Sequence, residues 1–83
     1  FWGLYGATKA ALNTLVLSYA DEMENTPLRV NLVNPGPIRT AMRAQAMPGE
    51  DPMTLRTPEQ ITDCFVDLAA ADCTRNGELV QAY

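Results

Sequence analysis

The sequence predicts an α/β fold in which short parallel strands alternate with helices. Three observations lead to this prediction: a helical pattern from Tyr5 to about Glu24, a short branched run closed by Pro35-Gly36-Pro37, and a further helix and strand after Thr57. The order helix, strand, helices, strand is typical of layered α/β proteins, and strands joined by a helical crossover normally run parallel. Because a two-stranded parallel sheet is a poor free-standing object, we expect further strands to belong to this sheet.

The first helix is predicted over residues 5–24, which contain no proline. Its apolar positions recur at helical spacing and continue to Tyr19 and Met23, which we expect in the core or at a subunit contact. Pro27 cannot continue the helix and marks its end. The branched run Leu28–Asn34 then predicts a buried strand that leads into a tight loop.

A short helix is predicted from Ala41 to Met47, with Thr40 as its N-cap. The prolines and glycine of Pro48–Pro52 then predict a mobile surface excursion. Two arginines stand near this helix start, and we expect both to be solvated. The alternative is that Arg39 and Arg43 meet a substrate carboxylate or a cofactor phosphate, since arginine offers a bidentate fork.

The clearest helix start in the chain is Thr57-Pro58-Glu59-Gln60, where threonine caps, proline occupies the first position and glutamine reaches back to the cap amide. The helix is predicted over residues 58–71. Its core-facing stripe consists of Ile61, Cys64, Phe65 and Leu68. A turn at Asn76-Gly77 and a final strand over residues 78–83 complete the predicted fold.

Composition excludes several classes of function. The formal net charge is −4 without a basic cluster, so we expect no nucleic-acid partner, and no apolar run is long enough to predict a membrane span. The chain has two cysteines and no histidine, which favours reduced thiols and a cytoplasmic protein, with a disulfide between Cys64 and Cys73 as the alternative. Asp63 and Asp67 share a helix face without metal-binding companions, so we predict a solvated face and no metal site.

Tyr5 and Lys9 are four residues apart and therefore share one face of the first predicted helix. Lys9 is the only lysine in the chain. A fixed ammonium beside a phenol favours the phenolate and makes the tyrosine a usable general acid or base near neutral pH. The alternative is an ordinary partly buried tyrosine beside a solvated lysine.

The loop Asn34–Thr40 follows the first predicted strand and leads into a helix. Ligands of open α/β sheets bind beyond the carboxyl ends of the strands, where this loop is expected to lie. Gly36 permits close backbone approach, and Thr40 offers a hydroxyl and a helix N-terminus to an anionic group. The alternative is a purely structural turn.

Together, Tyr5-x-x-x-Lys9 and Asn34-Pro35-Gly36, with Thr40 four residues after the glycine, resemble the C-terminal half of a compact short-chain dehydrogenase/reductase. The resemblance covers essentially all 83 residues. It implies the C-terminal part of a Rossmann-like doubly wound parallel sheet, so that residues 1–83 form the C-terminal half of an NAD(P)-binding domain and no complete domain. The implied reaction is hydride transfer between NAD or NADP and a small-molecule carbonyl or alcohol.

The resemblance also implies roles for individual residues. Tyr5 would exchange a proton with the substrate oxygen, while Lys9 would favour its phenolate and bind the nicotinamide ribose. The implied contacts to the nicotinamide, its carboxamide or the diphosphate come from Pro35, Gly36, the backbone of Ile38, and Thr40. The short helix and the excursion after it would form the variable substrate lid, and the first helix implies a homo-oligomer for the full enzyme.

Several family elements are not present in this sequence: the Gly-rich phosphate loop, the selector of NAD or NADP, and the catalytic serine, all of which precede the tyrosine. The chain also begins without methionine. We therefore expect a fragment or trimmed chain that is catalytically inactive alone. The competing hypothesis is a non-catalytic interaction module, a truncated product that folds by pairing its exposed sheet edge with another chain.

Overall fold

The computed structural model describes residues 2–83, and its helices and strands follow the predicted order. The elements are α1 (Trp2–Glu22), β1 (Leu32–Asn34), α2 (Ala41–Ala46), the 3₁₀ turns η1 (Pro52–Thr54) and η2 (Pro58–Ile61), α3 (Thr62–Ala69) and β2 (Leu79–Gln81). The predicted α/β class is confirmed.

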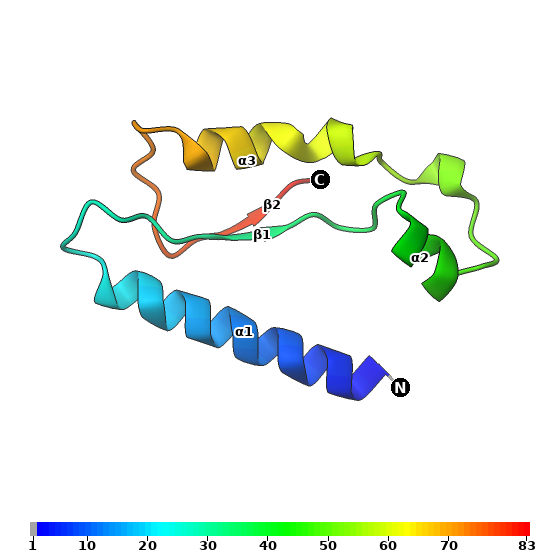
Figure 1. The fold of residues 1–83 in the computed structure, drawn as a ribbon, viewed down its shortest axis with the longest axis horizontal. Coiled ribbons are helices and arrows are strands. Elements are labelled where there is room, and N and C mark those ends of the chain that lie inside the picture. Colours follow the sequence, from blue (N-terminus) through cyan, green and yellow to red (C-terminus); the bar gives the residue numbers. More distant parts are fainter. Residues whose placement is uncertain (1) are drawn as a thin grey trace.

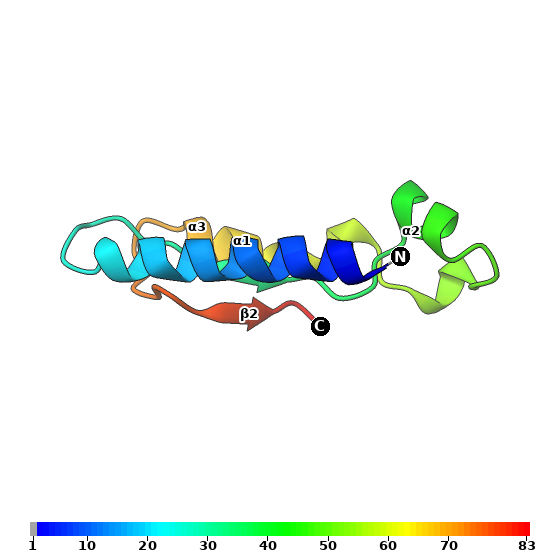
Figure 2. The same ribbon diagram turned by 90° about the horizontal axis from the view of Figure 1, so that it is seen from below.

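The two strands form a parallel pair, as predicted. The paired residues are Leu32 with Leu79, Val33 with Val80, and Asn34 with Gln81. Figure 1 shows α1 on one side of the strands and α3 on the other, which is the layering of a doubly wound α/β sheet. Turned by 90°, the molecule is thin, and its principal extents are 47 × 29 × 15 Å (Figure 2).

The first strand is shorter than the predicted Leu28–Asn34 because a side chain replaces part of its ladder. The N–H of Val30 donates to Oδ1 of Asn76 over 2.8 Å, whereas the N–H of Leu32 donates to the backbone carbonyl of Glu78 over 2.9 Å. Regular pairing therefore starts only at Leu32. The final strand is likewise confined to Leu79–Gln81, within the predicted 78–83, because its partner is equally short.

The first two helices differ little from prediction. α1 begins at Trp2 rather than Tyr5 and ends at Glu22 rather than Glu24, after which the N–H of Glu24 bonds three residues back in a turn. α2 has the predicted cap, since Oγ1 of Thr40 accepts the N–H of Arg43 over 3.1 Å.

The third predicted helix is divided in two. It opens as the 3₁₀ turn η2, and Ile61 departs from helical geometry with φ −118° and ψ 11° before α3 begins. At the other end, Ala70 is extended, so α3 stops short of the predicted residue 71. The predicted reciprocal cap bond is present, because the N–H of Thr57 donates to Oε1 of Gln60 over 2.8 Å.

The core is small. The buried apolar residues in the range 2–83 are Ala20, Ile61 and Val80. Of the stripe predicted for the third helix, Ile61 is buried and Cys64 and Leu68 are half-buried, but Phe65 is 47% exposed, so the prediction fails at that position.

The side chain of Asn76 connects α1 to the strand layer. Its Nδ2 donates to the carbonyl of Ala20 over 2.9 Å while its Oδ1 accepts from Val30. Tyr19 is exposed and Met23 half-buried, so the end of α1 is only partly covered by these contacts.

Some further predictions concern ligands and the chemistry of side chains. Cys64 and Cys73 are half-buried free thiols, so the disulfide alternative is not realised. Asp63 and Asp67 are exposed, as predicted. Across residues 2–83, no three His, Cys, Asp or Glu side chains gather in a way that could hold a metal ion. None of the helices in this range combines the length and apolar character needed to cross a membrane.

Candidate functional site

Tyr5 and Lys9 meet in the first turns of α1. Nζ of Lys9 lies 5.6 Å from the centroid of the Tyr5 ring, and the ring of Trp2 packs edge-on against the same tyrosine at a centroid distance of 5.6 Å. An ammonium at this distance is attracted to the ring face. Half of Tyr5 is exposed, so its side chain remains open to a partner from outside α1.

The α1 sequence explains why this pair is presented on a helix. Alanine and leucine between Tyr5 and Leu17 are strong helix formers, and this stretch contains no proline. Thr8 adds a local bond, because its Oγ1 donates to the carbonyl of Tyr5 over 2.8 Å. The helix thus places the phenol and the ammonium on one face at its N-terminal end.

The loop after β1 is held in a defined conformation. The N–H of Gly36 donates to Oδ1 of Asn34 over 3.1 Å, and the N–H of Ala82 donates to the carbonyl of Asn34 over 2.9 Å. Gly36 has a positive φ of 69°, and a Cβ at this position would lie 2.7 Å from Cδ1 of Tyr83. A close approach to Gly36 thus comes from within the chain itself, from the ring of Tyr83, which carries no local sequence signal.

Ile38 and Thr40 carry hydrogen-bond donors that have no acceptor among residues 2–83. Within the described range 2–83, the N–H of Ile38 has no hydrogen-bond partner, and the hydroxyl of Thr40 accepts the N–H of Arg43 without donating. Two free donors within three residues fit the oxygen atoms of a carboxamide or a phosphate. The donor chemistry of this loop thus fits the nicotinamide cofactor that the sequence resemblance implies.

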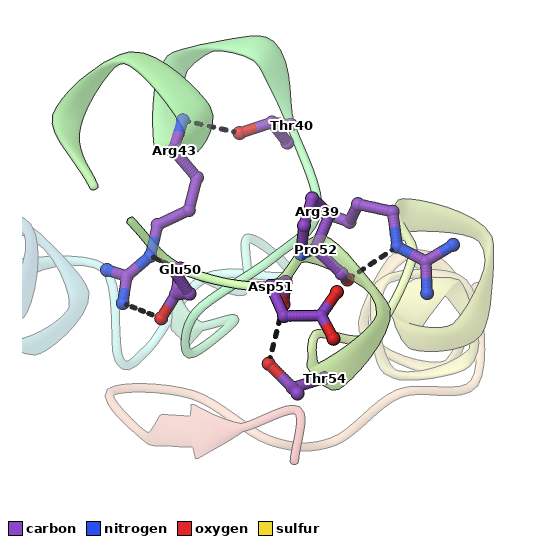
Figure 3. A network of polar contacts seen from close by, with 7 residues as sticks. All are labelled: Arg39, Thr40, Arg43, Glu50, Asp51, Pro52 and Thr54. Carbon is purple, nitrogen blue, oxygen red and sulfur yellow. Dashed lines mark hydrogen bonds and ion pairs between the residues drawn. The ribbon is translucent and has the colours of Figure 1, made fainter. Parts of the chain in front are cut away.

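The prediction that Arg39 and Arg43 are solvated holds only in part, because both side chains are partly exposed but also bond within the chain. Nε and Nη2 of Arg39 donate to the carbonyls of Pro52 and Leu55 over 2.9 and 3.1 Å. Figure 3 shows the Arg39 side chain directed at Pro52 and the Arg43 side chain directed at Glu50. Both guanidinium groups donate hydrogen bonds to the segment that follows α2, because that segment folds back toward the arginines.

Arg43 and Glu50 form a two-point ion pair. Nε and Nη2 of Arg43 lie 2.8 and 3.0 Å from the two carboxylate oxygens of Glu50. These hydrogen bonds lower the pKa of Glu50 from its ordinary value of 4.5 and raise the pKa of Arg43. The excursion predicted over Pro48–Pro52 is thereby tied to α2.

The two groups of predicted site residues lie at the same end of the molecule. In both Figure 1 and Figure 2, the N-terminal end of α1, which carries Tyr5 and Lys9, is at the end where the loop after β1 leads into α2. They come from separate elements. A groove of about 560 Å³ lies elsewhere and is lined by residues from α1 and from the segment that leads into β2, such as Asp21 and Arg75.

Comparison with known proteins places the chain among oxidoreductases. Residues 2–64 match the family described as enoyl-(acyl carrier protein) reductase. Over 74 residues the chain is 46% identical to the oxidoreductase YciK of Escherichia coli, a match that covers 89% of this chain and 29% of the relative.

Solved structures resemble the chain along nearly its whole length. A short chain dehydrogenase from Salmonella enterica serovar Typhi matches with a TM-score of 0.91 and 43% identity, over 98% of this chain and 34% of that one. A short chain dehydrogenase from Escherichia coli, crystallised with NADPH, matches with a TM-score of 0.89 and 41% identity, again over 98% and 34%. The chain spans about a third of the length of these relatives.

Proposed function

Since this chain belongs to the short-chain dehydrogenase/reductase family, we propose that it forms the C-terminal half of an NAD(P)-binding domain and carries the proton-transfer part of its active site. The observation that carries the proposal is the paired Tyr5 and Lys9 on α1, at the same end of the molecule as the Asn-Pro-Gly loop. The reaction is the reversible reduction of a small carbonyl compound to an alcohol.

Tyr5 is the proposed acid and base. Its hydroxyl donates a proton to the substrate oxygen during carbonyl reduction and takes it back during alcohol oxidation. Lys9 supplies a fixed positive charge beside the phenol, which favours the phenolate left after proton transfer. The bound nicotinamide supplies or accepts the hydride.

The loop after β1 is the proposed binding site for the nicotinamide end of the cofactor. Pro35 and Gly36 line the ring, while the free N–H of Ile38 and the hydroxyl of Thr40 bind the carboxamide or the diphosphate. Lys9 also binds the nicotinamide ribose. The cofactor is NAD or NADP, and solved relatives crystallised with NADPH and with NADP favour the phosphorylated form.

The test uses the product of the whole reading frame that contains this sequence, here called the complete protein. Tyr5→Phe removes the transferable proton, so we expect NADPH-dependent carbonyl reduction to fall by roughly 10²- to 10⁴-fold. The dissociation constant for NADPH, followed by its fluorescence, should stay within about twofold, because the ring is kept.

Tyr19→Phe is the matched control, since it removes a hydroxyl from an exposed tyrosine of the same helix. It should leave both turnover and NADPH binding unchanged. Retained turnover in Tyr5→Phe, or equal losses in the two variants, would refute the role of Tyr5.

We further propose that the complete protein is a cytoplasmic homo-oligomer and that residues 1–83 alone are inactive. A second candidate, a non-catalytic module that pairs with another chain, is favoured by one observation: the sheet formed by residues 2–83 has only two strands and therefore open edges. Purified complete protein that binds no nicotinamide cofactor would support this second candidate.

A further inference from the structure

The segment after the candidate cofactor loop folds back against that loop. Residues 41–56, here called the flap, contain α2 and η1 and end beside Ile38, which forms an isolated parallel β-bridge with Arg56. The N–H of Arg39 donates to the carbonyl of Arg56 over 2.8 Å. The backbone therefore brings the end of the flap into contact with the stretch Ile38–Thr40.

Arg39 strengthens this closure through its side chain. Its guanidinium spans two carbonyls of the flap, those of Pro52 and Leu55. Arginine presents several N–H groups in a rigid plane, so one side chain can fix the relative position of two backbone groups. Arg39 thus connects the loop to the far part of the flap.

Arg43 forms a second set of contacts that hold the flap together. Its guanidinium holds both carboxylate oxygens of Glu50, while its backbone N–H is the donor that Thr40 caps. The side chains of this pair are 29% and 28% exposed, against 45% and 46% for the other Arg–Glu pair, Arg75 and Glu78. Solvent therefore screens the Arg43–Glu50 pair less.

We propose that Arg39 and the Arg43–Glu50 pair are positioning residues, which hold the flap against Ile38–Thr40 so that this stretch presents one conformation to the cofactor. Without these contacts the loop would have to be ordered during binding, and cofactor affinity would fall by that ordering cost. The inference rests on the proposed function, because it takes Ile38 and Thr40 as cofactor contacts.

Charge reversal tests the pair in the complete protein. Arg43→Glu and Glu50→Arg each place like charges together, so we expect thermolysin to cut the flap of the cofactor-free protein about tenfold faster. The dissociation constant for NADPH should rise roughly threefold to tenfold in each single variant. The double variant restores the pair in reverse and should return both quantities toward wild type.

Arg39→Met tests the other contact. Methionine keeps much of the length of the side chain and removes the two donors to the flap. We expect faster flap cleavage and weaker NADPH binding here as well, with no rescue by the reversed Arg43–Glu50 pair.

The matched control reverses Arg75 and Glu78, an ion pair of the same type in the turn before β2. These variants should leave flap cleavage and NADPH affinity unchanged. A merely structural role for Arg43 and Glu50 would instead lower the melting temperature and expose cleavage sites throughout the protein, without a specific effect on cofactor binding.

Three outcomes would overturn the inference: single reversals that leave flap cleavage unchanged, a double variant no better than the singles, or faster cleavage without any loss of NADPH affinity. Failure of the proposed function has a different signature, because wild-type protein would then bind neither NADH nor NADPH. The cleavage rates of the same variants would still show whether the Arg43–Glu50 pair holds the flap closed.

Discussion

In the loop after β1, Gly36 is the position least able to accept a side chain. Its positive φ disfavours any side chain, and a Cβ would meet the ring of Tyr83 at 2.7 Å. Gly77 has a similar φ of 71°, but its nearest contact to an added Cβ is an ordinary 3.7 Å, from Ala20. Alanine substitution at Gly77 therefore tests backbone strain alone, whereas substitution at Gly36 tests backbone strain together with a steric clash.

We expect Gly36→Ala to destabilise the complete protein by about 2–4 kcal/mol and Gly77→Ala by about 1–2 kcal/mol. Gly49→Ala is the control, because an added Cβ there meets no atom within 4 Å. It should change stability by less than about 0.5 kcal/mol. Urea unfolding of the three variants measures this order, and equal losses at Gly36 and Gly77 would show that Tyr83 adds no constraint.

The sequence predicts residues best where their role is local. The Tyr5 and Lys9 pairing follows from helical spacing alone, and the cap at Thr40 follows from residue type and position. The contact between Gly36 and Tyr83 joins residues 47 positions apart and has no such local signal. Long-range partners of this kind require the fold.

At the scale of elements, the flap should respond to acid. The hydrogen bonds from Arg43 lower the pKa of folded Glu50 below 4.5. A carboxyl group with a depressed folded pKa stabilises the closed flap above its unfolded pKa, and this contribution is lost as the pH falls through the folded value.

We therefore expect the flap to stay closed from neutral pH down to the ordinary carboxyl pKa of 4.5, and to open as the pH falls further through the lower pKa of folded Glu50. The Nε–H signal of Arg43 in NMR spectra measures this, since exchange broadening should appear on the acid side. In Glu50→Gln the signal should be broadened at every pH tested. A wild-type signal that sharpens as the pH falls would contradict the assigned direction.

The sequence predicts element types better than element lengths. Thr57-Pro58 marks a helix start correctly, but the sequence does not reveal that Ile61 interrupts the helix after one 3₁₀ turn. The first strand is shorter than its branched residues predict because Asn76, distant in sequence, bonds to Val30. The sequence predicts solvated arginines because it does not reveal their acceptors, which are backbone carbonyls and one carboxylate that only the folded flap brings near.

At the scale of the whole molecule, the chain is thin and extended. Its radius of gyration is 15.2 Å, whereas about 12 Å is expected for a compact domain of this length. Large apolar side chains such as Leu4, Leu15 and Val66 are at least 66% exposed. Burial on this scale falls short of what offsets the conformational entropy of an independent domain.

We expect the 83-residue chain alone to lack a cooperative unfolding transition and to bind a hydrophobic dye, because its apolar faces are uncovered. The complete protein should unfold in one sharp transition and bind little dye. Circular dichroism during heating and dye fluorescence measure both. A sharp transition with native-like near-ultraviolet signal in the isolated chain would contradict this expectation, and nicotinamide-dependent turnover by it would contradict its proposed inactivity.

The flap also has a consequence for how such proteins can be recombined. Its side-chain donors and acceptors lie within residues 38–56, apart from Arg56, which reaches the carbonyl of Ala82 over 3.1 Å. A block exchanged between relatives with crossovers just before Ile38 and just after Arg56 would carry Arg39 and Arg43 together with their partners. A crossover between Arg43 and Glu50 would take the two partners of the ion pair from different parents. Functional chimaeras should therefore have their crossovers at the ends of the block rather than within it.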